Sequence, residues 1–201
     1  MELAWVLDVS GTITSEDHEK TKKFVNTLQA KIGLKNNNNK AAVVTYGDYA
    51  HKQIKCDDFE KVYDFSKKVD TLPNLPKQFT NTRDGLEKGQ ELLWSHGCGD
   101  PEIKKFIILL TDGLANRGIG NEAGLVQAAK DIQRNGTIIF VVAIGQFSDS
   151  QLAQMVDKNK YIHRTKAISK DAFASLNNEE FVSNVKDALC GNIRPERGES
   201  Y

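Results

Sequence analysis

The sequence predicts a single α/β domain built on a mostly parallel sheet that helices cover on both faces. Apolar runs alternate with amphipathic helical patterns along the 201 residues. Four runs are nearly continuous in apolar residues, as is typical of strands buried on both faces: "LAWVLD", "AAVVTYG", "KKFIILLTD" and "TIIFVVAIG". Right-handed crossovers between such strands give a doubly wound sheet.

Two shorter segments complete the expected sheet of six strands. The segment "HKQIKC" follows the second strand after only the turn "GDYA", which is too short for a parallel crossover. We therefore expect it to form one antiparallel edge strand. The segment "YIHRT" is expected to form the sixth strand.

Five segments carry the spacing of apolar residues that is typical of amphipathic helices. The first follows Thr14 and Ser15, which are both favourable N-cap residues. The apolar positions are, in chain order, Phe24, Leu28 and Ile32; Phe59, Val62, Phe65 and Val69; Leu86, Leu92 and Leu93; Leu125, Ala129 and Ile132; and Phe181, Val185 and Leu189.

Chain length predicts one domain, over residues 1–190, because 201 residues suffice for one α/β domain and not for two. Residues 191–201 are expected to form a flexible C-terminal tail or linker, and the chain to be part of a larger multidomain protein. Lys plus Arg and Asp plus Glu each number 27, which argues against a nucleic-acid partner. No apolar run approaches the roughly 18 residues of a membrane-spanning helix, so we expect no direct membrane insertion.

Three cysteines, Cys56, Cys98 and Cys190, are widely separated and form no CxxC pair, which argues against a zinc site. An odd count fits an extracellular domain with one internal bridge, and it also fits three reduced thiols in a cytosolic protein. The triplet "NGT" that begins at Asn135 is an acceptor sequon for N-linked glycosylation.

Oxygen-bearing side chains gather where the predicted strands end, which is where doubly wound folds bind ligands. They are Asp8, Ser10 and Thr12 after the first strand, Thr80 and Thr82 before the third helix, and Asp112 after "KKFIILLT". Such a set, with two carboxylates and no His or Cys, suits a hard cation such as Mg²⁺.

These segments resemble the metal-ion-dependent adhesion site of the von Willebrand factor type A family, which includes integrin inserted domains, matrilins and collagen VI modules. The family motif reads D-x-S-x-S, then a Thr at the start of the third helix, then an Asp in a T-D-G turn. The matching residues in this sequence are Asp8, Ser10, Thr12, Thr80 and Asp112. The resemblance covers residues 2–190. Thr12 stands where the family usually has Ser, and its additional methyl group stiffens χ1 and crowds the cation.

The resemblance implies adhesion, with no enzymatic activity. A divalent cation, Mg²⁺ first and Mn²⁺ or Ca²⁺ as alternatives, would be completed by an acidic residue of a partner such as collagen or another matrix protein. Specificity would come from a rim that includes Tyr49, Lys77, Arg83 and Arg117. The three cationic residues either border the site for an acidic partner or are ordinary solvated charges.

The resemblance also implies an extracellular location. Cys56 and Cys98 would both lie at the base of the sheet, where they can pair, and secreted members often bridge the Cys that corresponds to Cys190 to one before the first strand. An intracellular type A scaffold is an alternative.

A phosphatase is the alternative from another class. The segment "VLDVSGTI" is similar to the D-x-D-G-T signature of haloacid-dehalogenase phosphatases, in which Asp8 would be the nucleophile. Ser10 then occupies the position of the general acid and cannot donate a proton near neutral pH. No G-x-G-x-x-G follows any strand, which argues against a dinucleotide site.

Overall fold

The computed structural model describes residues 1–34, 39–74, 79–95, 97–113, 121–144, 152–156, 162–164 and 172–191. Its strands are β1 (Glu2–Asp8), β2 (Lys40–Tyr46), β3 (Ala50–Ile54), β4 (Lys105–Thr111), β5 (Thr137–Ala143) and β6 (Ile162–Arg164). Its helices are α1 (Ser15–Ile32), α2 (Val62–Asp70), α3 (Thr82–Leu93), α4 (Asn121–Arg134), α6 (Ala172–Ser175) and α7 (Glu179–Gly191).

The six strands form one sheet in the order β3-β2-β1-β4-β5-β6. All neighbouring pairs are parallel except β2 and β3, which are antiparallel. The predicted doubly wound sheet with one antiparallel edge strand is therefore confirmed. The chain passes from β1 outward to β3 and then returns to β4 on the other side of β1, so its direction along the sheet reverses between β1 and β4.

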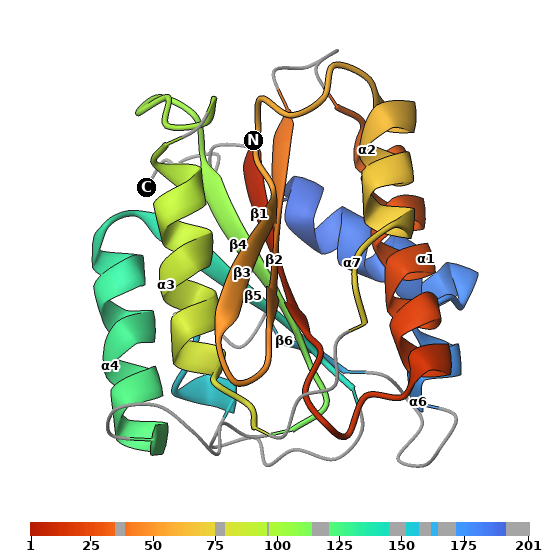
Figure 1. Ribbon diagram of the computed structural model, residues 1–201. Helices are drawn as coiled ribbons and strands as arrows, with labels where there is room; N and C mark the ends of the chain where they lie inside the picture. The colour runs from red at the N-terminus through yellow and green to blue at the C-terminus, as the bar shows by residue number, and fades with distance from the viewer. Residues whose placement is uncertain are drawn as a thin grey trace, which may run out of the picture.

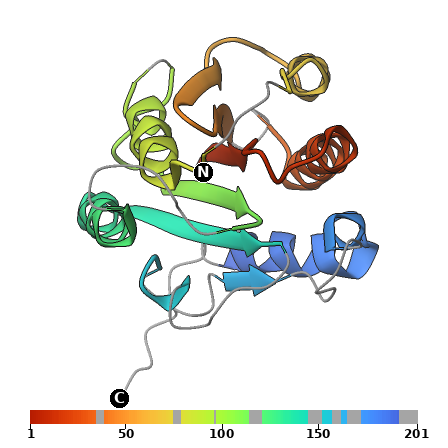
Figure 2. The same cartoon turned by 60° about the horizontal axis from the view of Figure 1, so that its bottom comes forward.

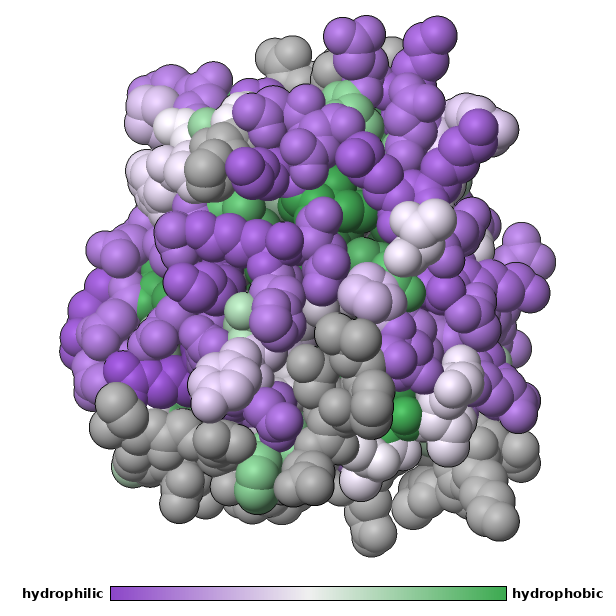
Figure 3. Space-filling model, viewed as in Figure 1, coloured by the Kyte–Doolittle hydropathy of each residue, from purple (hydrophilic) through white to green (hydrophobic). Residues whose placement is uncertain are grey.

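Helices cover both faces of this sheet (Figures 1 and 2). Helices α3 and α4 lie side by side on one face, and α1, α2, α6 and α7 lie on the other. The described surface seen in Figure 3 is mostly hydrophilic and shows apolar residues only in small patches. Most apolar side chains of the described residues are buried between the sheet and its two helical layers.

Trp5 of β1 illustrates how the core is packed, since it is fully buried against α1. Its ring meets Phe24 edge to face, with 6.2 Å between centroids, and its Nε1–H donates to Gln29 Oε1 at 2.9 Å. The indole therefore contributes apolar area and also satisfies its one polar group, as a buried Trp requires.

The helical segments predicted from apolar spacing are confirmed, with one boundary corrected. Thr14 caps α1, because its Oγ1 accepts the N–H of Asp17 at 3.1 Å. Helix α2 begins at Val62 and leaves out Phe59, because Lys61 before it has an extended backbone. Phe59 still packs on Phe65, with ring centroids 5.1 Å apart, which explains why it fitted the apolar pattern. The short helix α6 was not predicted.

A disulfide joins Cys56, just after β3, to Cys98, before β4, with 5.6 Å between their Cα atoms. Their expected position at the base of the sheet allowed this pairing. Cys190 in α7 is a half-buried free thiol. None of the helices in the described ranges is both long and apolar enough to cross a membrane.

Candidate metal centre

Asp8 and Asp112 lie at the carboxyl ends of neighbouring strands, where the chain reverses its direction along the sheet. Asp8 is the last residue of β1, and Asp112 directly follows β4. These strand ends lie at the bottom of the molecule in Figure 1 and come forward in Figure 2. Ligand sites in open α/β sheets form at such a reversal, because the two loops diverge and leave a crevice.

The carboxylate of Asp8 is buried and held by hydrogen bonds on both oxygens. It is 4% exposed. Its Oδ1 accepts the N–H of Ser10 at 2.9 Å. Its Oδ2 lies 3.2 Å from the hydroxyl of Tyr46 and 3.0 Å from that of Thr111. A carboxylate accepts about four hydrogen bonds, so Oδ1 retains a lone pair for another partner.

A chain of hydroxyl groups connects the first loop to Asp112. Ser10 Oγ lies 3.2 Å from Thr12 Oγ1, and Thr12 Oγ1 donates to Asp112 Oδ1 at 3.1 Å. Because each hydroxyl has one hydrogen, Thr12 accepts from Ser10 while it donates to Asp112. Both hydroxyl oxygens keep a free lone pair. The methyl group of Thr12 does not turn its oxygen away from the cluster.

Burial and charge repulsion shift the ionisation of this cluster. Burial, reinforced by the charge of Asp112, raises the pKa of Asp8 to about 6 against the hydrogen bonds from Ser10 and Thr111. Burial also raises the pKa of Asp112, against the hydrogen bond from Thr12. Burial, together with the charge of Asp8, raises the pKa of Tyr46 well above its ordinary value, so its hydroxyl keeps its proton and can donate it.

Thr80 lies at the same end of the sheet, two residues before α3, and is 6% exposed. The N–H of the next residue, Asn81, donates to the carbonyl of Gly47 at 2.8 Å, and Gly47 directly follows β2. Asn81 also caps α3 by accepting the N–H of Asp84 at 3.3 Å. These bonds fasten the loop of Thr80 beside the strand that ends in Tyr46.

The predicted rim is described only in part. Lys77 and Arg117 lie outside the described residues. Tyr49 is 60% exposed, in the turn between β2 and β3. Arg83 pairs with Glu87 one turn along α3, with 2.7 Å between Nε and Oε1. This ion pair offsets part of the positive charge of Arg83.

Three residues near the site were not singled out from the sequence. Tyr46 and Thr111 orient Asp8 through hydrogen bonds. In the sequence, only their position at the ends of predicted strands pointed to such a role. Phe79 is 40% exposed, and its N–H donates to Asp48 Oδ1 at 2.9 Å, so it lies next to the turn between β2 and β3. The sequence feature that could have pointed to Phe79 is its position as an aromatic residue directly before Thr80.

The donor set fits a hard cation. In the part of the chain that the structure describes, no three His, Cys, Asp or Glu side chains gather into a metal cluster, so hydroxyl oxygens have to supply further ligands. Ser10 and Thr12 offer such oxygens beside the two carboxylates of Asp8 and Asp112, whose pKa values are raised first by burial. Oxygen ligands of this kind are those that Mg²⁺ prefers.

Comparison with known proteins yields related matrix proteins. The chain is 25% identical over 162 residues to mouse (Mus musculus) collagen alpha-5(VI) chain, a match that covers 77% of this chain and 6% of the relative. It is 26% identical over 154 residues to human (Homo sapiens) collagen alpha-6(VI) chain, with the same coverage. The chain thus spans only a small part of the length of these relatives.

Among solved structures, proximal thread matrix protein 1 from the mussel byssus is similar, with a TM-score of 0.81 and 23% identity. The match covers 94% of this chain and 47% of that one. Another structure of the mussel protein, described as having a zinc-occupied MIDAS motif, matches with a TM-score of 0.79 over 94% of this chain and 48% of that one. The sequence model of the von Willebrand factor type A domain family matches residues 2–182 of this chain. Together with the fold, this match shows that the chain belongs to the von Willebrand factor type A domain family.

Proposed function

We propose that this domain is an extracellular adhesion module, without enzymatic activity, that binds a partner protein through a divalent cation. Asp8, Ser10, Thr12, Thr80 and Asp112 would hold the cation, with Mg²⁺ as the preferred ion. The observation that carries the proposal is the hydrogen-bonded chain from Ser10 through Thr12 to Asp112, beside the buried Asp8. Four of the five proposed ligands thereby converge from two loops.

Electrostatics favour a cation at this place. Two carboxylates close to one another and shielded from water repel, and this repulsion contributes to the raised pKa of Asp8. A bound cation would supply the positive charge that stabilises both carboxylates in their ionised form. Tyr46 and Thr111 orient Asp8 from behind, as second-shell hydrogen bonds commonly do for metal ligands.

An open coordination position would make the site adhesive. Five protein groups leave at least one position of an octahedral ion to water or to a partner. An Asp or Glu carboxylate of a partner protein would occupy that position and add negative charge. Binding would then require the metal and be reversed by a chelator.

The rim would select the partner. Tyr49 and Phe79 present exposed aromatic rings, the type of residue that often dominates protein interfaces. Lys77, Arg83 and Arg117 would add positive charge for an acidic partner. The collagen relatives support a matrix partner such as collagen, an extracellular location and membership of a larger multidomain protein.

Metal calorimetry tests the site. We expect Mg²⁺, or Mn²⁺ or Ca²⁺ as alternatives, to bind wild-type protein at one site, and Asp112→Ala to lower that affinity by about tenfold or more. Asp187→Ala, at an exposed position of α7, is the matched control and should bind as the wild type does. Equal metal affinity in Asp112→Ala and wild type would show that the site is wrongly assigned.

Partner binding and turnover separate adhesion from catalysis. Immobilised collagen should retain the domain in Mg²⁺ and release it in a chelator, and Asp8→Asn should not be retained. A generic aryl phosphate should not be hydrolysed. Sustained turnover that Asp8→Asn abolishes would overturn the adhesion proposal in favour of the phosphatase alternative.

A further inference from the structure

The sequon Asn135-Gly136-Thr137 forms the tight connection between α4 and β5. It is the single N-x-S/T triplet in the 201 residues. Helix α4 ends at Arg134, and β5 begins at Thr137. Asn135 is exposed, and Gly136 has a φ of +80°, a backbone conformation that favours glycine. The acceptor side chain is therefore at the surface, in a turn that its neighbouring glycine makes possible.

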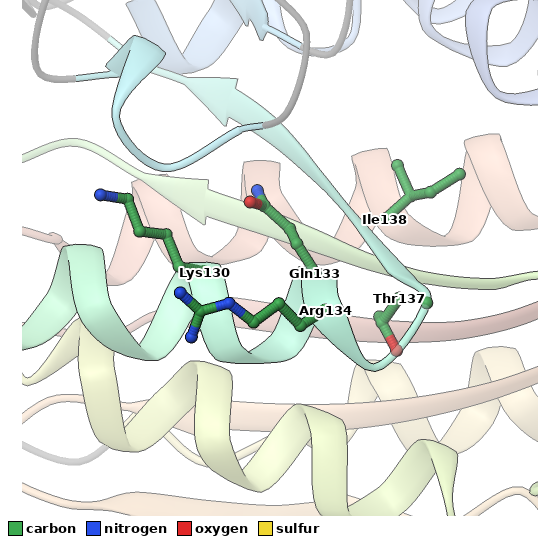
Figure 4. A pocket seen from close by; sticks show the side chains of 6 residues that line it. Lys130, Gln133, Arg134, Thr137 and Ile138 are labelled. Atoms are coloured by element: carbon green, nitrogen blue, oxygen red, sulfur yellow. The ribbon is translucent and has the colours of Figure 1, made fainter.

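The side chain of Thr137 is buried where β5 begins. Thr137 is 1% exposed, and its Oγ1 finds no hydrogen-bond partner among the residues that the structure describes. The residue lines a hollow of about 440 Å³ next to the end of α4 (Figure 4), whose other lining residues are Lys130, Gln133, Arg134, Gly136 and Ile138. A buried hydroxyl without a partner is destabilising, and valine has nearly the same shape without that cost.

The Thr at position 137 completes a glycosylation sequon with Asn135. N-linked glycosylation requires a hydroxyl two residues after the acceptor Asn. We propose that Asn135 carries an N-linked glycan and that the hydroxyl of Thr137 serves the modification and not the fold. The proposal rests on the extracellular location in the proposed function, since this modification takes place in the secretory pathway.

The chemistry is a transfer from a lipid-linked donor. Nδ2 of Asn135 attacks the anomeric carbon of an oligosaccharide attached to a lipid pyrophosphate. The new N–C bond forms as the C–O bond to the pyrophosphate breaks. The lipid pyrophosphate leaves with the bonding electron pair, and the proton lost from Nδ2 passes to the solvent or to a base of the transferase.

The burial of Thr137 sets the order of events. Thr137 pairs with Lys105 of β4 in the finished sheet, and in that state its hydroxyl is inaccessible to a transferase. The glycan must therefore be added before β5 joins β4. Folded, unglycosylated protein should not be a substrate.

The position of Asn135 keeps a glycan away from the candidate metal centre. Thr137 is level with Lys105, and Ala143 is level with Thr111, so β5 separates Asn135 from the strand ends that carry Asp112. Six residues of strand at about 3.3 Å each amount to roughly 20 Å. A glycan at Asn135 would shield the opposite end of the domain and leave the adhesive end free.

The test is expression of the full chain behind a secretion signal in cultured animal cells, with medium and cell lysate both analysed. Wild type and Thr137→Ser should show a gel shift that peptide-N-glycosidase removes, and mass spectrometry should locate the sugar on Asn135. Asn135→Gln and Thr137→Val should lose the shift completely. Wild type without a glycosidase-sensitive shift in either fraction would overturn the proposal.

Two further measurements sharpen the result. In bacterially produced, unglycosylated protein, Thr137→Val should raise Tm by about 2–4 °C, because it removes the unpaired hydroxyl. An unchanged or lowered Tm would show that the fold uses the hydroxyl and would overturn that half of the proposal. Calorimetry with Mg²⁺ on the secreted protein separates the two proposals, since metal binding without a glycan contradicts only this one, and a glycan without metal binding contradicts only the proposed function.

Discussion

Asp8 is the residue whose chemistry depends most on its surroundings. Its pKa of about 6 means that, between pH 3.8 and about 6, the folded state holds a proton that the unfolded chain releases. The free energy of unfolding of metal-free protein therefore falls as pH rises through that window. At about 1.4 kcal/mol per pKa unit, the loss is ~3 kcal/mol above the window.

The pH dependence of thermal stability checks this value. In a chelator, wild type should lose Tm as pH rises from about 4 to about 6.5, and saturating Mg²⁺ should remove most of that loss. The Tm of Asp8→Asn should fall much less over the same pH range. Without metal at neutral pH, Asp8→Asn should therefore be more stable than the wild type. A pH slope in Asp8→Asn equal to that of the wild type would contradict the raised pKa of Asp8.

Thr12 is the residue at which the sequence departs from the usual family motif. Its hydroxyl already reaches both Ser10 and Asp112, so the extra methyl group does not exclude it from the cluster. We expect Thr12→Ser to change Mg²⁺ affinity by no more than about threefold, and Thr12→Ala to lower it by about tenfold or more, because the connecting oxygen is lost. Calorimetry of the two variants decides, and a Thr12→Ala protein with unchanged affinity would remove Thr12 from the site.

At the scale of the elements, α3 sits unusually close to the sheet beneath the site. A Cβ at Gly85 would lie 2.9 Å from Cδ1 and from Cγ of Tyr46, and 3.0 Å from Cγ1 of Val6. Glycine at this position lets the helix approach β2 closely. The hydroxyl of Tyr46 in turn donates a hydrogen bond to Asp8.

Gly85→Ala should therefore harm both stability and metal binding. We expect a loss of about 1–3 kcal/mol, the usual cost of overpacking, even though alanine is the better helix former. Chemical denaturation and Mg²⁺ calorimetry measure the two effects. Gly191→Ala is the control at the end of α7, where a Cβ meets nothing within 4 Å, and it should be nearly neutral. Equal stability of the two variants would contradict the close packing.

At the scale of the whole molecule, the two ends of the sheet have separate roles. The Cys56–Cys98 disulfide closes a segment of 42 residues at the end opposite to Asp8 and Asp112. Cross-linking a loop of this length stabilises a protein by about 4 kcal/mol in the chain-entropy model. Its loss should destabilise the domain without changing the site.

Replacing both cysteines tests this separation. The double variant Cys56→Ser with Cys98→Ser should unfold at lower denaturant concentration, by about 2–4 kcal/mol, and should bind Mg²⁺ with the affinity of the wild type while folded. A loss of metal affinity in the folded double variant would show that the two ends of the sheet are coupled.

Much of the fold could be predicted because its signals are local. Apolar runs located the four strands β1, β2, β4 and β5, and the short turn after β2 predicted the antiparallel edge strand β3. The predicted start of α2 was wrong because it included Phe59. A residue that packs under a helix fits the same apolar spacing as a residue within the helix.

The sequence by itself determined the fold class and the identity of the oxygen-bearing residues, since strand hydrophobicity and motif spacing are properties of neighbouring residues. Only the tertiary structure decided what those residues meet. Tyr46 and Thr111 donate hydrogen bonds to Asp8, and Gly85 lies close to Tyr46, although these residues are far apart in the chain. The hydroxyl of Thr137, by contrast, meets no partner among the described residues. Burial and charge act through space, so the raised pKa of Asp8 exists only after β1 and β4 are brought side by side.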